Sequence, residues 1–151
     1  MDQRLVYSWY EQHKTGIYRY VFAITKDPYL AEDILQDTFL KVLSGKAPQN
    51  LDMAQAWLYR VARNLCFDHL RKLKHEHPYL KIPEDMEIRY AYIDLICGLS
   101  PREQEIVTLK IVGGLTHSEI GAVLGISAKA AQKRYERAIA ALRKQEEENG
   151  R

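Results

Sequence analysis

Residues 115–144 read LTHSEIGAVLGISAKAAQKRYERAIAALRK, and this stretch decides the fold of the C-terminal half of the chain. Thr116 and Glu119 have the spacing of a capping box, which starts a first helix. Gly125 then suits a turn that needs a positive φ angle, and Ser127 is a good N-cap for a second helix. The stretch therefore predicts a helix-turn-helix.

The second of these helices has one apolar side and one basic side on a helical wheel. The apolar side carries Ala131, Tyr135, Ala138, Ile139 and Leu142, and the basic side carries Lys129, Lys133 and Arg137. Ala128 and Ala130 lie near the first turn, where small side chains leave room for close approach to DNA. We interpret this helix as a DNA reader; a solvated basic face on an ordinary packed helix is the alternative.

The rest of the chain also reads as helix, because glycine and proline fall at natural boundaries and no alternating strand pattern is present. We expect an all-α fold of two small helical domains joined by a short linker. The expected domains are 1–73 and 88–145, with the linker at 74–87 and a frayed tail at 146–151. The expected helices span 5–25, 28–44, 53–74, 88–98, 101–112, 117–124 and 128–145.

The composition is that of an ordinary folded protein: of 151 residues, 46% are hydrophobic and 28% are charged, and the formal net charge is +2. Cys66 and Cys97 lie in apolar helical patterns, so we expect buried, reduced thiols. No apolar run reaches the ~18 residues of a membrane span, and the N-terminal stretch has no signal-peptide core. These features favour a cytoplasmic protein.

Enzyme chemistry has little support in the sequence. Asp33 and Asp37 are one helical turn apart but have no His or Ser partner nearby in the sequence. His69, His75 and His77 form a weak metal pattern, because no cysteine accompanies them. No phosphate-binding glycine motif is present. We expect no catalytic residues, no metal site and no cofactor.

An acidic face marks the helix expected over 28–44. Its apolar side carries Ala31, Ile34, Leu35, Thr38 and Val42, and the polar side carries Glu32, Asp33, Gln36 and Asp37. Exposed carboxylates beside an apolar stripe suit a basic partner surface. A solvated acidic face is the alternative.

The long helix expected over 53–74 interleaves cations, aromatics and an asparagine. Its core stripe is Leu58, Val61, Ala62 and Leu65, and the other side carries Arg60, Arg63, Asn64, Phe67, Asp68 and Arg71, with Trp57 at its edge. Cations hold a nucleic-acid backbone and aromatic rings stack on unpaired bases, so this helix suits a single strand. Alternatively, Trp57 and Phe67 are core residues and the arginines are solvated.

Three blocks in order carry a family resemblance: DPYLAEDILQDTFLKVL, AWLYRVARNLCFDHLRK and LSPREQEIVTLKIVGGLTHSEIGAVLGIS followed by KRYERAIAALRK. Together they resemble the extracytoplasmic-function (ECF) sigma factors of bacterial RNA polymerase over nearly the whole chain. The resemblance implies that the chain keeps the second and fourth sigma domains. It also implies core RNA polymerase, promoter DNA and an anti-sigma factor as partners.

The resemblance assigns roles to residues of this chain. Asp33, Gln36, Asp37 and Phe39 would bind the clamp helices of the largest polymerase subunit, and the C-terminal domain would bind the flap of the second largest. The −10 element would be melted and read by Lys46, Gln49, Asn50, Arg60, Arg63, Asn64, Asp68, Arg71 and Lys72, with one base flipped out of the stack. The −35 element would be read by Ser127, Lys129, Ala130, Gln132, Lys133, Arg134 and Arg137.

Two features depart from the family pattern. Gln132 stands where many members have a lysine that contacts a base or a phosphate, and the linker is short for the family. A stand-alone helix-turn-helix regulator is the main rival function, but such a protein needs neither the acidic helix nor the arginine-rich one. A response-regulator output protein would need an α/β receiver domain, and a helical adaptor that binds only protein is a weaker rival.

Overall fold

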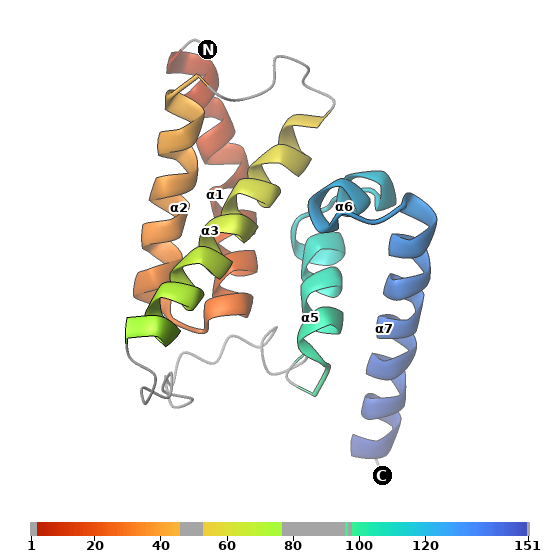
Figure 1. Cartoon of the computed structure of the whole chain (residues 1–151). Coiled ribbons are helices and arrows are strands. Elements are labelled where there is room, and N and C mark those ends of the chain that lie inside the picture. The colour runs from red at the N-terminus through yellow and green to blue at the C-terminus, as the bar shows by residue number, and fades with distance from the viewer. Residues whose placement is uncertain (1–2, 46–52, 77–95, 97, 151) are drawn as a thin grey trace.

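The computed structural model describes residues 3–45, 53–76, 96 and 98–150, and within these ranges every regular element is a helix. The N-terminal domain consists of α1 (Gln3–Thr25), α2 (Pro28–Leu43) and α3 (Ala54–Glu76). The C-terminal domain consists of α5 (Pro101–Val107), the π-helical turn η2 (Thr108–Val112), α6 (His117–Leu124) and α7 (Ala128–Asn149). The two domains lie side by side, with α7 on the far side of the C-terminal domain (Figure 1). The expected all-α class is confirmed.

Local capping chemistry sets the boundary between α1 and α2. The Asp27 side chain accepts hydrogen bonds from the backbone amides of Tyr29 and Leu30, and Pro28 occupies the first helical position. Lys26, just before this cap, has a positive φ of 56° and ends α1. The start of α2 is thus where the Asp-Pro pair predicts it.

The C-terminal domain is held by two capping boxes and two special glycines. Ser100 with Glu103 caps α5, and Thr116 with Glu119 caps α6, each with both reciprocal hydrogen bonds. Gly125 ends α6 in the left-handed region at φ 72°. A Cβ atom on Gly121 would meet the carbonyl oxygen of Ile126 at 2.6 Å, so only glycine lets the two helices approach this closely. The predicted helix-turn-helix is confirmed.

Three boundaries differ from the sequence expectation. The helix expected over 101–112 changes from α to π geometry at Thr108, because Gly113 N–H bonds to the Thr108 carbonyl and the chain then turns. Residues 146–149 belong to α7 rather than to a frayed tail, and α3 continues to Glu76, into the stretch expected as linker. The helix expected over 88–98 lies mostly outside the described residues.

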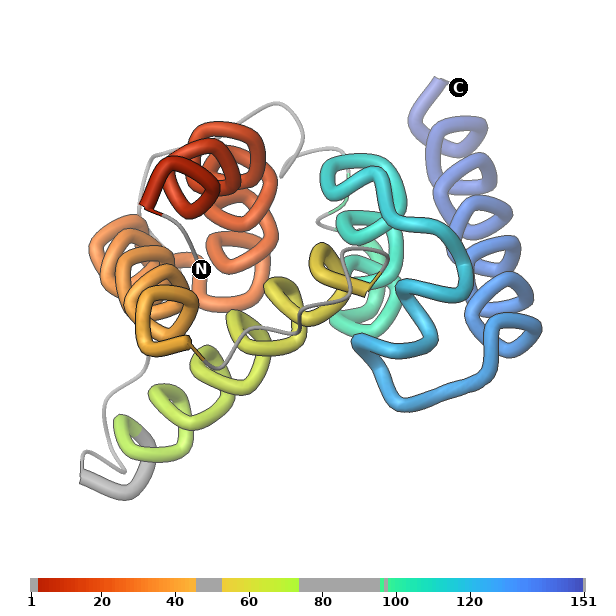
Figure 2. Tube along the Cα trace, turned by 90° about the horizontal axis from the view of Figure 1, so that it is seen from above, coloured from red at the N-terminus to blue at the C-terminus, as the bar shows by residue number. Residues whose placement is uncertain are grey.

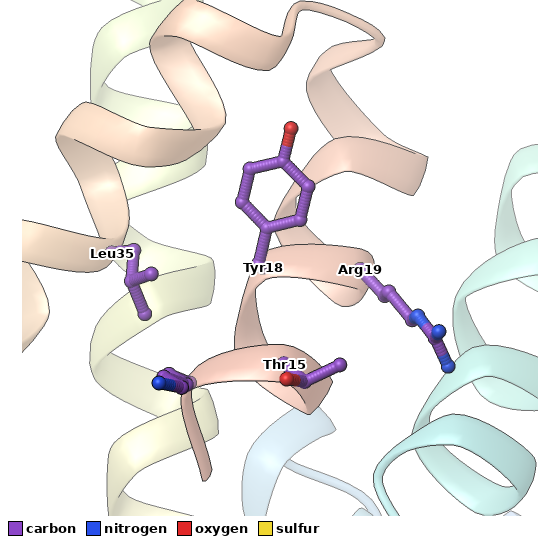
Figure 3. A pocket seen from close by; sticks show the side chains of 5 residues that line it. Thr15, Tyr18, Arg19 and Leu35 are labelled. Atoms are coloured by element: carbon purple, nitrogen blue, oxygen red, sulfur yellow. The ribbon is translucent and has the colours of Figure 1, made fainter. Parts of the chain in front are cut away.

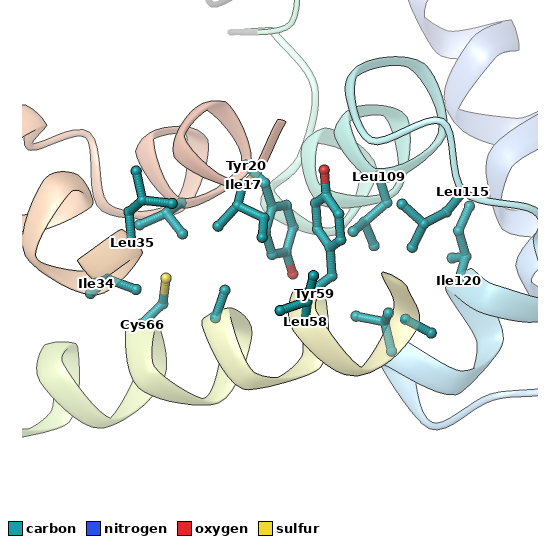
Figure 4. Close-up of a cluster of buried hydrophobic side chains, with 14 of the residues drawn as sticks. Ile17, Tyr20, Ile34, Leu35, Leu58, Tyr59, Cys66, Leu109, Leu115 and Ile120 are labelled. Carbon is teal, nitrogen blue, oxygen red and sulfur yellow. The ribbon is translucent and has the colours of Figure 1, made fainter. Parts of the chain in front are cut away.

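One apolar core runs through both domains. Ile17 and Tyr20 of α1 and Leu58 of α3 are buried in the same cluster as Leu109 and Leu115 of the C-terminal domain (Figure 4). Seen from above, α3 passes from the N-terminal domain to the C-terminal domain and packs on α6 (Figure 2). The chain therefore folds as two helical units that share a core.

Candidate polymerase-binding and nucleic-acid-binding surfaces

The exposed side of α2 extends beyond the predicted acidic residues and includes apolar side chains. Five exposed residues spaced by three and four positions make one stripe: Tyr29, Asp33, Gln36, Leu40 and Leu43. Tyr29 is 79% exposed, Leu40 60% and Leu43 58%. We name these five residues the α2 stripe. The stripe therefore offers a partner both apolar side chains and a carboxylate.

The structure corrects the expectation for Phe39. This side chain is only 6% exposed, and its ring packs edge-to-face on Tyr10 of α1, with ring centroids 5.1 Å apart. Phe39 therefore stabilises the N-terminal domain from inside and is not available to a partner. Asp37 is partly exposed, and its Oδ2 lies 3.9 Å from Nε2 of His69 on α3.

The residues predicted on α3 for −10 DNA fall on two different sides of the helix. Arg60, Asn64, Asp68, Arg71 and Lys72 are all exposed, and we name them the α3 stripe. Within it, Arg71 Nη2 donates to Asp68 Oδ1 at 2.6 Å. The exposed pair is weak in water, so Arg71 can exchange it for a phosphate. Lys46, Gln49 and Asn50, predicted for the preceding loop, lie outside the described residues.

Arg63 faces the other domain instead of solvent. Its guanidinium lies over the Phe67 ring at 4.7 Å from the centroid, and its Nε donates to Glu105 Oε1 of α5 at 2.6 Å. Both side chains are mostly covered, with 29% of Arg63 and 12% of Glu105 exposed. Among the described residues that were predicted to bind −10 DNA, Arg63 is therefore the one that forms an ion pair with the C-terminal domain.

Glu105 also accepts a hydrogen bond from Tyr20 of α1. The Tyr20 hydroxyl donates to the same Oε1 atom at 2.7 Å. Burial raises the pKa of the Tyr20 phenol well above its usual range, and the neighbouring Glu105 carboxylate raises it further. The hydroxyl therefore stays protonated and remains a donor.

A cavity of about 450 Å³ lies beside this polar contact. It is bordered by the end of α1, by Arg63, Phe67 and Leu70 of α3, and by the start of α5. A shallower pocket of about 320 Å³ lies on α1, next to Leu35 of α2 (Figure 3). Its polar lining residues are Lys14, Thr15, Tyr18 and Arg19.

The outer face of α7 presents cations as predicted. Lys129, Lys133 and Arg137 are exposed, as are Ala130 and Gln132, while Arg134 is half-buried. The opposite side packs inward through buried Ala131 and Ala138 and partly buried Tyr135, Ile139 and Leu142. Ser127 Oγ accepts from Ala130 N–H at 3.0 Å, so this residue acts first as the helix cap.

Sequence reasoning missed two groups of residues in these surfaces. The exposure of Leu40 and Leu43 could have been found, because both lie at helical spacing from Asp33 and Gln36. The contacts of Tyr20, Arg63 and Glu105 had no local signal, because Glu105 is 85 positions from Tyr20 and 42 from Arg63.

The described residues give no indication of a metal centre or a membrane span. No three or more His, Cys, Asp or Glu side chains gather there in an arrangement that could hold a metal ion. None of the helices described is both long enough and apolar enough to cross a bilayer.

Comparison with protein families matches both domains. The model of Sigma-70 region 2 matches residues 9–76, and that of Sigma-70, region 4 matches residues 89–142. The first match covers α2 and α3, and the second covers the helix-turn-helix.

Curated relatives are similar over most of the chain. The RNA polymerase sigma factor CarQ of Myxococcus xanthus is 30% identical, over 89% of this chain and 84% of CarQ. The ECF sigma factor SigM of Bacillus subtilis is 28% identical, over 78% of this chain and 80% of SigM. The ECF sigma factor SigE of Mycolicibacterium smegmatis is 29% identical, over 94% of this chain but only 63% of that protein.

Solved structures share the fold. CnrH, solved with the cytosolic domain of CnrY, superposes with a TM-score of 0.72 at 24% identity, covering 97% of this chain and 90% of CnrH. RpoE of Bartonella quintana, solved with the anti-sigma factor NepR, superposes with a TM-score of 0.66 at 19% identity, covering 91% and 95% of the two chains. With the family models and the curated relatives, these matches lead to one conclusion: the chain belongs to the sigma-70 family of RNA polymerase sigma factors, in its extracytoplasmic-function group.

Proposed function

We propose that this chain is an exchangeable subunit that binds core RNA polymerase, recognises a promoter in two parts and opens the −10 region, with no catalysis of its own. One observation carries the proposal: three exposed faces of different chemistry lie on three different helices. These are the α2 stripe, the α3 stripe and the basic face of α7. A stand-alone duplex-DNA regulator would use only the last of them.

Each face has a role that follows from its chemistry. The α2 stripe, with its carboxylate and its exposed leucines, would bind the clamp helices of the largest polymerase subunit. The arginines of the α3 stripe would hold the backbone of the separated −10 strand, while Asn64 offers polar contacts to a base edge. The cations of α7 would hold phosphates around the −35 major groove. Region 4 would also contact the flap of the second largest subunit.

We further propose that an anti-sigma factor controls this protein in the bacterial cytoplasm, where RNA polymerase works. The family membership supports this, as do the two solved relatives, one of which was crystallised with the anti-sigma factor NepR. Such a partner would compete for the same faces that polymerase and DNA need.

The direct test is gel filtration of the purified protein with bacterial core RNA polymerase in the absence of DNA. Stoichiometric co-elution is expected, followed by promoter-dependent transcription in vitro. A matched pair of variants sharpens the test: Asp33→Lys on the α2 stripe should weaken co-elution, whereas Glu147→Lys at the end of α7 should not. If wild-type protein shows no association with core while binding duplex DNA as a dimer, the stand-alone regulator is correct.

A further inference from the structure

An acidic side chain lies among the cations on the basic face of α7. Glu136 is exposed and points away from the side of the helix that carries buried Ala138. On a helical wheel it lies within about 60° of Lys129, Gln132 and Lys133, which are exposed as well. DNA phosphates repel a carboxylate at this place, so Glu136 weakens the binding of α7 to a duplex of arbitrary sequence.

The Glu136 carboxylate is held by a neighbour on the same face. Gln132 Nε2 donates to Glu136 Oε1 at 3.2 Å, and residues four positions apart face each other on a helix. The bond draws the carboxylate toward the N-terminal end of α7, the direction in which long helical side chains lean. In a helix-turn-helix, this end of the second helix contacts base edges in the major groove. Oε2 of Glu136 remains available as a hydrogen-bond acceptor.

The first turn of α7 leaves base reading to residues farther along. Ala128 and Ala130 are exposed there, and their methyl side chains neither donate nor accept hydrogen bonds. They allow the start of the helix to approach DNA closely. Glu136 follows about 12 Å along the helix axis from Ala128, and its longer side chain reaches back toward that start.

The four bases differ sharply in what they offer a carboxylate, which only accepts hydrogen bonds. In the major groove, cytosine presents the N4 amino donor, whereas guanine presents the acceptors N7 and O6 and thymine the acceptor O4. Adenine presents its N6 donor beside the N7 acceptor. A carboxylate therefore bonds best to cytosine, less well to adenine, and is repelled by guanine and thymine.

We propose that Glu136 is a specificity-determining residue of this sigma factor, which selects cytosine at one position of the −35 element by accepting from its N4 amino group. Gln132 is its positioning residue. The inference rests on the proposed function, because it requires α7 in the major groove. Lys129 and Lys133 hold phosphates and carry no sequence information, whereas Glu136 penalises every sequence that lacks the cytosine donor.

The test selects promoter sequences with the holoenzyme, reconstituted from bacterial core RNA polymerase and the full-length protein. A library of duplexes randomised across the promoter region is incubated with it, and the bound fraction is sequenced. The variants are Glu136→Gln, which keeps the shape and removes the charge, and Gln132→Ala. Glu147→Gln is the matched control, because it makes the same change on the same helix about 16 Å farther along. Sequence preferences in the −10 region serve as an internal control.

The expected wild-type result is a preference of about tenfold for cytosine over guanine or thymine at one upstream position. Glu136→Gln should reduce this preference to about twofold or less and strengthen binding to duplexes without that cytosine. Gln132→Ala should reduce the preference at the same position only, and Glu147→Gln should match wild type. The −10 preferences should be the same for all four proteins.

The outcomes separate this inference from the proposed function. A cytosine preference that survives in Glu136→Gln, or a different base preferred by wild type wherever Glu136→Gln alters the selection, overturns the role of Glu136. An unchanged preference in Gln132→Ala overturns the positioning role. If the wild-type holoenzyme selects a −10 motif but no upstream motif, α7 does not read the −35 element and the inference fails with that assignment. Absence of any holoenzyme would overturn the proposed function itself.

Discussion

Phe39 and Leu40 are adjacent in the chain but have opposite environments. Phe39 packs on Tyr10 in the core, whereas Leu40 is 60% exposed on the α2 stripe. A helix rotates by about a quarter turn per residue, so a one-position difference decides whether a side chain stabilises the fold or faces a partner. The family pattern alone does not make this distinction, and the structure does.

At Leu40, a truncation should affect binding and leave stability nearly unchanged. Leu40→Ala removes exposed apolar area from the α2 stripe, so core-polymerase binding should weaken by about tenfold if this leucine is buried in the complex. Ile111→Ala is the matched control, because Ile111 is also an exposed aliphatic residue but lies on η2. Equal Kd values for both variants, measured by fluorescence anisotropy, would exclude Leu40 from the interface.

Cys66 should be unreactive in the native protein. Burial raises the pKa of its thiol to about 12, so very little thiolate exists at pH 8. In a Cys97→Ser background, reaction with a thiol reagent such as DTNB should be at least about 100-fold slower without denaturant than with it. Comparable rates in the two conditions would show that Cys66 is not held in the core as described.

At the scale of elements, the capped starts of helices were predictable, whereas the ends of α3 and α7 and the π geometry at Thr108–Val112 were not. Asp27, Ser100, Thr116 and Ser127 all cap helices as the sequence indicates, because a cap depends on neighbouring residues only. The π-helical turn Thr108–Val112 was not predictable. It depends on how η2 meets α1, a contact between segments far apart in the sequence.

The basic face of α7 gives a prediction that concerns the whole element. Lys133→Ala combined with Arg137→Ala should weaken binding to a duplex that carries the −35 element. It should also reduce the slope of log K against log salt concentration by about two, because two phosphate contacts are lost. Arg143→Ala with Lys144→Ala, farther along the same helix, is the control. An unaltered salt slope in the first variant would contradict a DNA-facing role for this side of α7.

At the scale of the whole molecule, the arrangement of the domains lay beyond sequence reasoning. The blocks of the chain predict two helical domains, and the family models match both of them. The contact between them depends on Tyr20, Arg63 and Glu105, none of which stands out by pattern or propensity. Their roles follow from tertiary packing alone, and for the same reason no local pattern indicates that Arg63 contacts Glu105 of α5.

His13 should make the stability of the whole molecule depend on pH. Burial lowers the pKa of this histidine below its usual 6.5, while Glu119 of α6, across the domain boundary, partly opposes the shift. The unfolded chain therefore binds a proton more readily than the folded one. The contribution of neutral His13 to the free energy of unfolding is complete above pH 6.5. It is lost as the pH falls from there through the lower pKa of the folded state.

Urea unfolding at a series of pH values measures this contribution. The free energy of unfolding of wild-type protein should fall more steeply below pH 6.5 than that of His13→Gln, which cannot be protonated at this position. The two proteins should show parallel curves above that pH. Parallel curves over the whole range would mean that the buried environment of His13 does not persist in solution.

The shared core also has a consequence for the order in which a ribosome makes this protein. Ile17 and Tyr20 are synthesised about 90 residues before Leu109 and Leu115, which cover them in the finished molecule. At about 5–20 residues per second, this face of α1 waits roughly 5–20 s for its cover. During that interval the N-terminal domain exists with this inner face uncovered. The nascent chain therefore carries an exposed apolar face until the C-terminal half has been translated.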